Sequence, residues 1–259
     1  MTFNTIADTR YGPFVYNKND QIIGRALSLY GEYCEGELEL LRQLCRPGSV
    51  VADIGANVGA ITVPLATHVG MSGFVYAFEP QRVVFQTLCS NVALRSLTNV
   101  ECIAAGVGAE HGHATIPDLD YDREANFGGF ELGTFQRGRK VPIVTLDDYR
   151  DVAHFDLIKI DVEGMELEVL RGGEQLIREQ RPLLYVENDR PEKSEALVAA
   201  LQRLEYNCFW HRPLLFNANN YRHNPDNIFG SASFVNMLCL PRERPAQLDG
   251  FDPVEWRSP

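Results

Sequence analysis

Two short segments of the chain combine glycines and carboxylates in a pattern that suits a nucleoside. The first is the run Asp53–Gly59 (D-I-G-A-N-V-G), which follows an apolar stretch, and the second is Phe78-Glu79-Pro80. Glycines in a turn after a strand let a ligand lie against bare backbone. A carboxylate at the end of the next strand can accept hydrogen bonds from both ribose hydroxyls. The two segments therefore predict a nucleoside pocket.

The middle residue between Gly55 and Gly59 distinguishes among nucleoside cofactors. A dinucleotide fingerprint needs glycine where this chain has Asn57, because a side chain there crowds the pyrophosphate. S-adenosylmethionine has no phosphate, so it tolerates the asparagine. We expect Asp53 to bind its ammonium group, directly or through water, and Glu79 to bind its ribose. The alternative is that Gly55 and Gly59 only form a tight turn and Asp53 caps a helix; the combined spacing favours the cofactor.

A second dense segment, Phe155–Glu166 (F-D-L-I-K-I-D-V-E-G-M-E), places carboxylates after another apolar strand. Asp161 then lies at the carboxyl edge of the sheet, where ligands bind in such folds, and Glu163 follows in the turn. Either group can orient a substrate hydroxyl or amide, accept its proton, or bind a divalent ion. The alternative is that both are helix N-terminal carboxylates that interact with the dipole. Asp161 beside Glu187 is a conceivable magnesium site, but solvated loop carboxylates are commoner, so a metal is not favoured.

Alternating strands and helices must position these groups. Apolar strands are expected at 50–54, 74–78, 100–106, 157–161 and 182–187, with helices at 35–45, 60–68, 83–94, 166–178 and 193–204. This alternation predicts a parallel sheet covered on both faces. The strands expected at 206–216 and 233–240 have only a polar loop between them, so they should pair antiparallel. The fold class is α/β: a Rossmann-like, mostly parallel seven-stranded sheet with a C-terminal antiparallel hairpin.

Composition limits the cellular setting and the partners. The 259 residues carry a net charge of −11 at a pI near 5.0, which disfavours a nucleic-acid partner. The chain shows no run of eighteen apolar residues and no basic n-region at its start, so neither a membrane span nor export is expected. Six cysteines without a CxxC pair indicate reduced core residues and not a zinc site. A cytoplasmic location is expected.

The motifs together resemble the FkbM family of S-adenosylmethionine-dependent methyltransferases. The resemblance runs through D-I-G-A-N-V-G, A-F-E-P, D-L-I-K-I-D-V-E-G-M-E, V-L-R-G-G and R-P-L-L-Y-V-E in that order. It extends to Y-G-E-Y at 30–33 with Glu37, V-T-L-D-D at 144–148 and N-M-L-C at 236–239. It implies methyl transfer from S-adenosylmethionine, with S-adenosylhomocysteine as product, most often to oxygen on a sugar or secondary metabolite; some relatives methylate nitrogen.

These inferences assign candidate site residues. The candidate catalytic groups, which orient the acceptor or take its proton, are Asp161, Glu163, His211 and His223. The residues expected around the cofactor are Asp53, Gly55, Ala56, Asn57, Gly59, Glu79, Pro80, Ala105, Asp161, Glu37 and Tyr30. A lone histidine is more often structural, so either histidine has that alternative.

The chain is expected to divide into a lead-in and cofactor flap (1–34), a methyltransferase domain (35–241) and a tail (242–259). The lead-in is expected to be irregular up to residue 33. The insertions 110–140 and 217–230 are expected to bind a small-molecule, sugar or secondary-metabolite acceptor, with a peptide as another option. For 217–230 a plain turn-forming loop is the alternative. The function expected is O-methylation; the alternatives are an N-methyltransferase acting on a peptide side chain or amine, a non-catalytic nucleoside-binding protein and, more distantly, a nicotinamide oxidoreductase.

Overall fold

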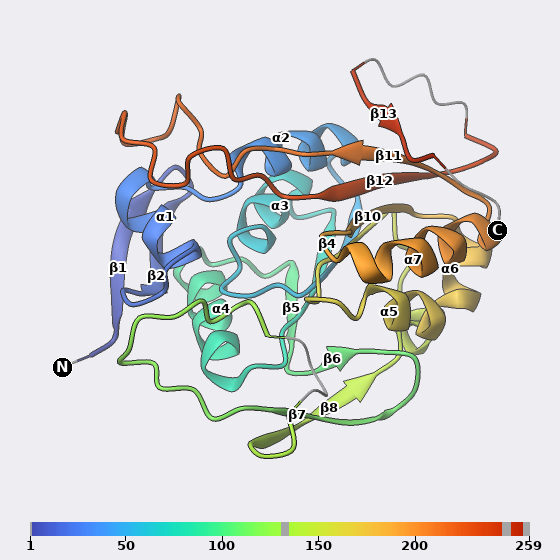
Figure 1. Cartoon of the computed structure of the whole chain (residues 1–259), viewed down its shortest axis with the longest axis horizontal. Helices are drawn as coiled ribbons and strands as arrows, with labels where there is room; N and C mark the ends of the chain where they lie inside the picture. The colour runs from blue at the N-terminus through green and yellow to red at the C-terminus, as the bar shows by residue number, and fades with distance from the viewer. Residues whose placement is uncertain (1, 131–134, 245–249, 256–259) are drawn as a thin grey trace.

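The computed structural model describes residues 2–130, 135–244 and 250–255 and is organised around one large sheet (Figure 1). In spatial order its strands are β13 (Asp252–Pro253), β11 (Tyr206–His211), β12 (Asn236–Pro241), β10 (Leu183–Glu187), β9 (Leu157–Ile160), β3 (Val50–Ile54), β4 (Phe74–Phe78) and β5 (Val100–Ile103). Strands β10, β9, β3, β4 and β5 are parallel, and β12 pairs antiparallel with both β10 and β11. The predicted fold class is confirmed, and the two-residue β13 adds an edge strand to the seven expected.

Helices cover both faces of this sheet, as the apolar strands require. One face carries the 3-10 helix η1 (Leu146–Tyr149), α5 (Glu166–Gly172), α6 (Glu174–Gln180) and α7 (Pro191–Arg203). The other carries α2 (Glu35–Leu44), α3 (Thr62–Val69) and α4 (Arg82–Leu94). Central strands are therefore buried on both sides: all four residues of β9 and all five of β10 are buried.

The single helix predicted at 166–178 is wrong, because α5 and α6 are separate helices. The break falls at Gly172-Gly173. A Cβ on Gly172 would lie 2.0 Å from the carbonyl oxygen of Gly108, so the helix approaches that backbone too closely for any side chain. The glycine pair thus reflects a tertiary contact.

The N-terminal residues are ordered, and the prediction of an irregular lead-in is wrong. They form a hairpin of β1 (Asn4–Thr9) and β2 (Gly12–Asn17), followed by α1 (Ile23–Tyr30). The side-chain amide of Asn91 on α4 accepts from the Val15 amide and donates to the Val15 carbonyl. Phe14 and Tyr16 pack in the same apolar cluster as Leu88 of α4. The hairpin is therefore docked on the domain.

The long insertion after β5 is partly a second sheet. The strand predicted at 100–106 ends at Ile103, and β6 (Gly106–Val107), β8 (Arg139–Val144) and β7 (Gly112–Ile116) form a three-stranded sheet in that order. Residues 117–130 between its strands are irregular, apart from one bridge of Ala125 to Asp20. Residues 131–134 of the predicted insertion lie outside the described residues.

The connection between β11 and β12 runs over α1 and α2 (Figure 1). Both strands are shorter than predicted, which leaves residues 212–235 to cross this region. Their position is held by Tyr30, whose hydroxyl donates to the Asp226 carbonyl at 2.8 Å and accepts from the Ile228 amide at 3.0 Å. The described residues include no helix long and apolar enough to cross a bilayer.

Candidate active site

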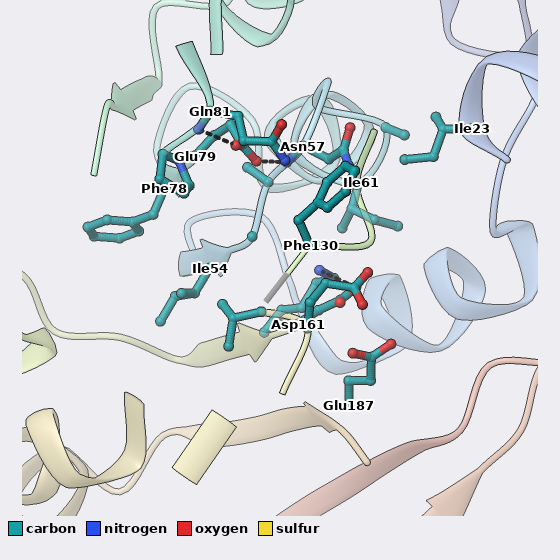
Figure 2. Close-up of a pocket in the computed structure, with 18 of the residues that line it drawn as sticks. Ile23, Ile54, Asn57, Ile61, Phe78, Glu79, Gln81, Phe130, Asp161 and Glu187 are labelled. Atoms are coloured by element: carbon teal, nitrogen blue, oxygen red, sulfur yellow. Dashed lines mark hydrogen bonds and ion pairs between the residues drawn. The ribbon is translucent and has the colours of Figure 1, made fainter. Parts of the chain in front are cut away.

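A cavity of about 240 Å³ opens at the carboxyl ends of β3, β4, β9 and β10. This is the edge of the sheet where open α/β folds bind ligands. Figure 2 shows Glu79, Asn57 and Gln81 on one side of it, Asp161 and Glu187 on the other, and Phe130 between the two groups. The cavity thus has a neutral-to-acidic end on β4 and a strongly acidic end on β9 and β10.

The turn after β3 is possible only because of its glycines. Gly55 has φ of +87°, and a Cβ there would lie 1.7 Å from the Asp161 carbonyl oxygen. The turn therefore presses directly against the end of β9 and joins the two predicted motifs. Asn57 also has positive φ (49°), which asparagine tolerates better than most residues. Its side-chain oxygen accepts from the Val58 amide at 2.8 Å, which closes the turn on itself.

Glu79 connects this turn to the end of β4. One carboxyl oxygen accepts from the Asn57 amide at 3.0 Å and the other from the Gln81 amide at 2.7 Å. The side chain is buried, and burial raises its pKa to about 7 although the two amide hydrogen bonds oppose the shift. Each oxygen still has acceptor capacity, so the carboxylate can bind a pair of hydroxyls from a ligand in the cavity.

Gln81 supplies a second buried acceptor on the same side. The nitrogen of its side-chain amide donates to the Phe127 carbonyl at 2.7 Å. This contact fixes the orientation of the amide group. The remaining oxygen is buried and lacks a hydrogen-bond partner in the described residues. A buried acceptor without a partner is costly, so it suits a ligand that brings an N–H or O–H donor.

Lys159 is a cavity residue that the sequence analysis did not single out. It is the one charged residue of β9 and is only 3% exposed. Its ammonium group lies 3.4 Å from an Asp53 oxygen and 3.2 Å from an Asp161 oxygen. Those carboxylates raise its pKa although burial alone would lower it. The sequence does contain a signal for this residue, a lysine inside an apolar strand. A buried charge of this kind needs charged partners, so it could have been predicted to pair with nearby carboxylates.

The opposite wall of the cavity is acidic. Asp161 is 34% exposed and is paired with Lys159, whereas Glu163 is paired with Arg190 at 2.7 Å. Burial, followed by the charge of Asp161, raises the pKa of Glu163 to about 7, and Arg190 opposes the shift. Glu187 is 9% exposed, and burial together with the neighbouring carboxylates raises its pKa strongly. In the described part of the chain, no group of three or more His, Cys, Asp or Glu residues has an arrangement that could hold a metal ion.

Most of the residues expected at the site do meet here. Those that line the cavity are Gly55, Ala56, Asn57, Glu79, Pro80, Ala105, Asp161 and Glu163. They come from the ends of β3, β4 and β9 and from the segment before β6. Gly59 stands behind the turn instead, where a Cβ would meet Leu88 at 2.8 Å. Its role in the structure is to let α4 pack against the turn.

Asp53 does not line the cavity, contrary to the expectation that it contacts a ligand. It is fully buried beneath the turn, where it accepts from the Thr62 hydroxyl at 2.6 Å and pairs with Lys159. Glu37 is likewise buried behind the cavity; it accepts from the Cys34 thiol and from the Asn236 side-chain amide, each at 3.5 Å. Burial raises the pKa of Glu37 to about 7. Both carboxylates support the site from behind.

Three other expected residues lie away from the cavity. Tyr30 holds the β11–β12 connection, as described above. His211 lies on β11, where its ring nitrogen is 2.7 Å from the Tyr185 hydroxyl. His223 is exposed in the same connection, with φ of 54°. The structure therefore does not bring either histidine to the proposed reaction centre, because neighbouring strands and loop geometry direct both elsewhere.

Three aromatic residues that were not among the candidate site residues also line the cavity. Tyr33, Phe130 and Phe234 line it, and the Tyr33 and Phe234 rings meet edge to face at a centroid distance of 5.7 Å. They belong to the segment before α2, the insertion and the β11–β12 connection. No sequence pattern joins them, since three separate segments meet only in the folded chain.

The fold is that of a Rossmann-like methyltransferase. The profile of the FkbM methyltransferase domain matches residues 53–209, more than half of the chain. The protein therefore belongs to the FkbM methyltransferase family.

Curated relatives and a solved structure agree with this assignment. Methyltransferase 1 from Beauveria bassiana (strain ARSEF 2860) is 26% identical over 145 residues, covering 48% of this chain and 58% of that protein. Methyltransferase sdnD from Sordaria araneosa is 26% identical over 183 residues, covering 58% of this chain and 70% of that protein. The crystal structure of methyltransferase FkbM from Methylobacillus flagellatus KT matches with a TM-score of 0.51 at 20% identity, covering 74% of this chain and 44% of that one. The match thus spans less than two thirds of the Beauveria protein and of the Methylobacillus chain, and the structural likeness concerns the fold.

Proposed function

We propose that this protein transfers a methyl group from S-adenosylmethionine to a hydroxyl oxygen of a small-molecule acceptor such as a sugar or secondary metabolite. The observation that carries the proposal is Glu79: a buried carboxylate, held by two backbone amides, in the wall of a cavity at the carboxyl edge of the sheet. Family membership supports the reaction type.

The groups around Glu79 fit the cofactor. The carboxylate can accept from both ribose hydroxyls, and the unpartnered oxygen of Gln81 offers an acceptor to a donor of the nucleoside. The apolar residues Ile54 and Phe78 and residues 105–107 supply walls for a base. Asn57 occupies the position that a dinucleotide would need free for its pyrophosphate. The donor set therefore suits a nucleoside without a diphosphate.

When bound, S-adenosylmethionine supplies a methyl group already activated by the positive sulfur. The protein then has to align the acceptor, exclude water and take up a proton. We assign the last of these tasks to Asp161, because its carboxylate is partly exposed, lines the cavity and pairs with Lys159. Phe130 and Phe234 can exclude water from the same region. Glu163 is paired with Arg190, so we assign it to orienting the acceptor and not to accepting its proton.

Calorimetry tests the cofactor part of the proposal. S-adenosylhomocysteine should bind and NAD should not. Glu79→Gln should weaken S-adenosylhomocysteine about 10- to 100-fold, the loss expected for charge-assisted hydrogen bonds of about 1.5–3 kcal/mol. Glu101→Gln, which removes an exposed carboxylate on the adjacent strand β5, is the matched control and should bind as the unaltered protein does. A folded protein that does not bind S-adenosylhomocysteine would overturn the proposal.

The acceptor atom needs a separate experiment. Transfer from S-adenosylmethionine with an isotopically labelled methyl group, followed by mass spectrometry of the product, distinguishes O-methylation from N-methylation. Asp161→Asn should lower turnover with little effect on S-adenosylhomocysteine binding.

As part of the same proposal we place the protein in the cytoplasm, since all six cysteines are free thiols, a state that a reducing compartment maintains.

A further inference from the structure

Glu187 is a buried carboxyl group that no hydrogen bond or ion pair among the described residues explains. It ends β10, is 9% exposed and lines the cavity, and one of its oxygens has no hydrogen-bond partner in the described residues. In Figure 2 its carboxyl group points toward Asp161. Burial without a partner is costly for such a group, so a structural role alone does not account for it.

The neighbouring cations are already engaged. Lys159 pairs with Asp53 and Asp161, and Arg190 pairs with Glu163 and Asp189. The described part of the chain contains no ion pair to Glu187. Among the described residues, this end of the cavity therefore has more carboxylates than cations to match them.

Four carboxylates act on Glu187 more strongly than the cation Arg190, which also interacts with it. Asp161, Asp189, Glu163 and Glu166 all raise its pKa, in addition to burial. A positive charge delivered into the cavity would reverse this effect and favour the ionised form. Binding of a cation next to Glu187 should therefore release a proton.

Aromatic rings complete the surroundings. Tyr33, Phe130 and Phe234 line the same cavity, each from a different segment. Aromatic faces together with carboxylates form the usual surroundings of a bound ammonium group, because the ring faces attract cations. Two independent features, an orphaned carboxyl group and a set of aromatic walls, thus fit one kind of ligand.

We propose that Glu187 anchors a protonated amino group of the acceptor, so that the substrate carries both an ammonium group and the hydroxyl that is methylated. The assignment of the hydroxyl as the methylated group rests on the proposed function. A protonated amine has no free electron pair and cannot accept a methyl group; the ammonium group therefore serves as an anchor, and a hydroxyl near Asp161 is the acceptor. The substrate class is a hydroxylated amine, for example an amino sugar or an aromatic amino alcohol.

The test compares benzylamine with benzyl alcohol, two probes of nearly equal shape that differ in charge. Binding is measured by calorimetry to the protein saturated with S-adenosylhomocysteine. Benzylamine should bind about tenfold more tightly or better, and Glu187→Gln should abolish this preference without changing benzyl alcohol binding. Repeating the titration in buffers of different ionisation enthalpy should show proton release with benzylamine, which the variant lacks. Glu195→Gln, an exposed position on α7, is the control for loss of one negative charge.

The outcomes separate this inference from the proposed function. Equal binding of the two probes, no binding of either, or a preference that survives Glu187→Gln would overturn the amine anchor. A loss of S-adenosylhomocysteine affinity in Glu187→Gln would also overturn it and assign the carboxyl group to the cofactor. If S-adenosylhomocysteine fails to bind, the proposed function fails, but the probe titrations on the free protein still decide the anchor. Circular dichroism checks that the variant is folded, and proton release by the unaltered protein does not depend on any variant.

Discussion

Replacing Lys159 tests the central electrostatic feature of the site. Lys159→Met keeps most of the length and of the apolar stem of the side chain but removes the ammonium group. Asp53 is then left fully buried, with the Thr62 hydroxyl as its remaining side-chain partner. We expect a large loss of stability, because an uncompensated buried charge is among the most destabilising changes in a protein.

The magnitude follows from the distances. At an effective dielectric constant of about 20, two unit charges at the observed 3.4 Å attract by about 5 kcal/mol. The contact with Asp161 adds less than its 3.2 Å distance suggests, because Asp161 is 34% exposed and solvent screens it. Removing one partner of a buried pair costs about 3–5 kcal/mol, and we expect Lys159→Met to lower the free energy of unfolding by that amount.

Urea denaturation followed by circular dichroism measures this loss. Lys140→Met, at an exposed lysine of β8, is the control and should change stability by no more than about 0.5 kcal/mol. Adding Asp53→Asn to Lys159→Met should restore about 2 kcal/mol or more, because the orphaned charge is removed with its partner. A loss below about 1 kcal/mol for Lys159→Met, or a double variant no more stable than the single one, would refute the reasoning.

Three further predictions concern the turn, the pH dependence and the β11–β12 connection. Gly55→Ala should destabilise the protein by about 2–4 kcal/mol, measured by urea denaturation, because alanine resists positive φ and its Cβ would collide with the Asp161 carbonyl; an unchanged midpoint would contradict this. Burial raises the pKa of Glu79 to about 7, so the free protein is protonated there at lower pH, whereas a carboxylate is needed to accept from ribose. The affinity for S-adenosylhomocysteine should therefore rise with pH up to about 7 and then level off, by calorimetry, and Glu79→Gln should remove this dependence. Tyr30→Phe removes the hydroxyl that holds the connection; hydrogen exchange in residues 217–230 should accelerate, at a cost of about 1 kcal/mol, while S-adenosylhomocysteine binding stays the same.

Much of the site follows from local patterns in the chain. Gly55 and Glu79 can be assigned to a nucleoside pocket because a turn glycine and a strand-end carboxylate act through the backbone geometry of their own strand–turn–helix unit. Asp161 follows for the same reason, since a parallel strand delivers its last residue to the ligand edge of the sheet. The fold class was accessible too, because buried parallel strands and an antiparallel return leave distinct marks in the spacing of apolar residues.

Other features depend on which side chains face each other across the fold. Asp53 and Lys159 lie on neighbouring strands, and only the register of β3 against β9 makes them partners, which turns the expected ligand contact of Asp53 into a buried ion pair. His211 and His223 have the right chemistry, but Tyr185 and an exposed loop hold them elsewhere. The hairpin at 4–17 was expected to be irregular because its position depends on contacts with α4, which lies about seventy residues later in the chain.

The sequence by itself therefore determined the parallel α/β sheet and the family, and it predicted the turn to which we assign the nucleoside. Only the tertiary structure decided which carboxylates face the cavity and that one oxygen of Glu187 has no hydrogen-bond partner there in the part of the chain that the structure describes. It also brought Tyr33, Phe130 and Phe234 together. The physical reason is range: backbone turns and apolar periodicity are encoded within a few residues, whereas burial and charge pairing are set by segments that meet only when the chain folds.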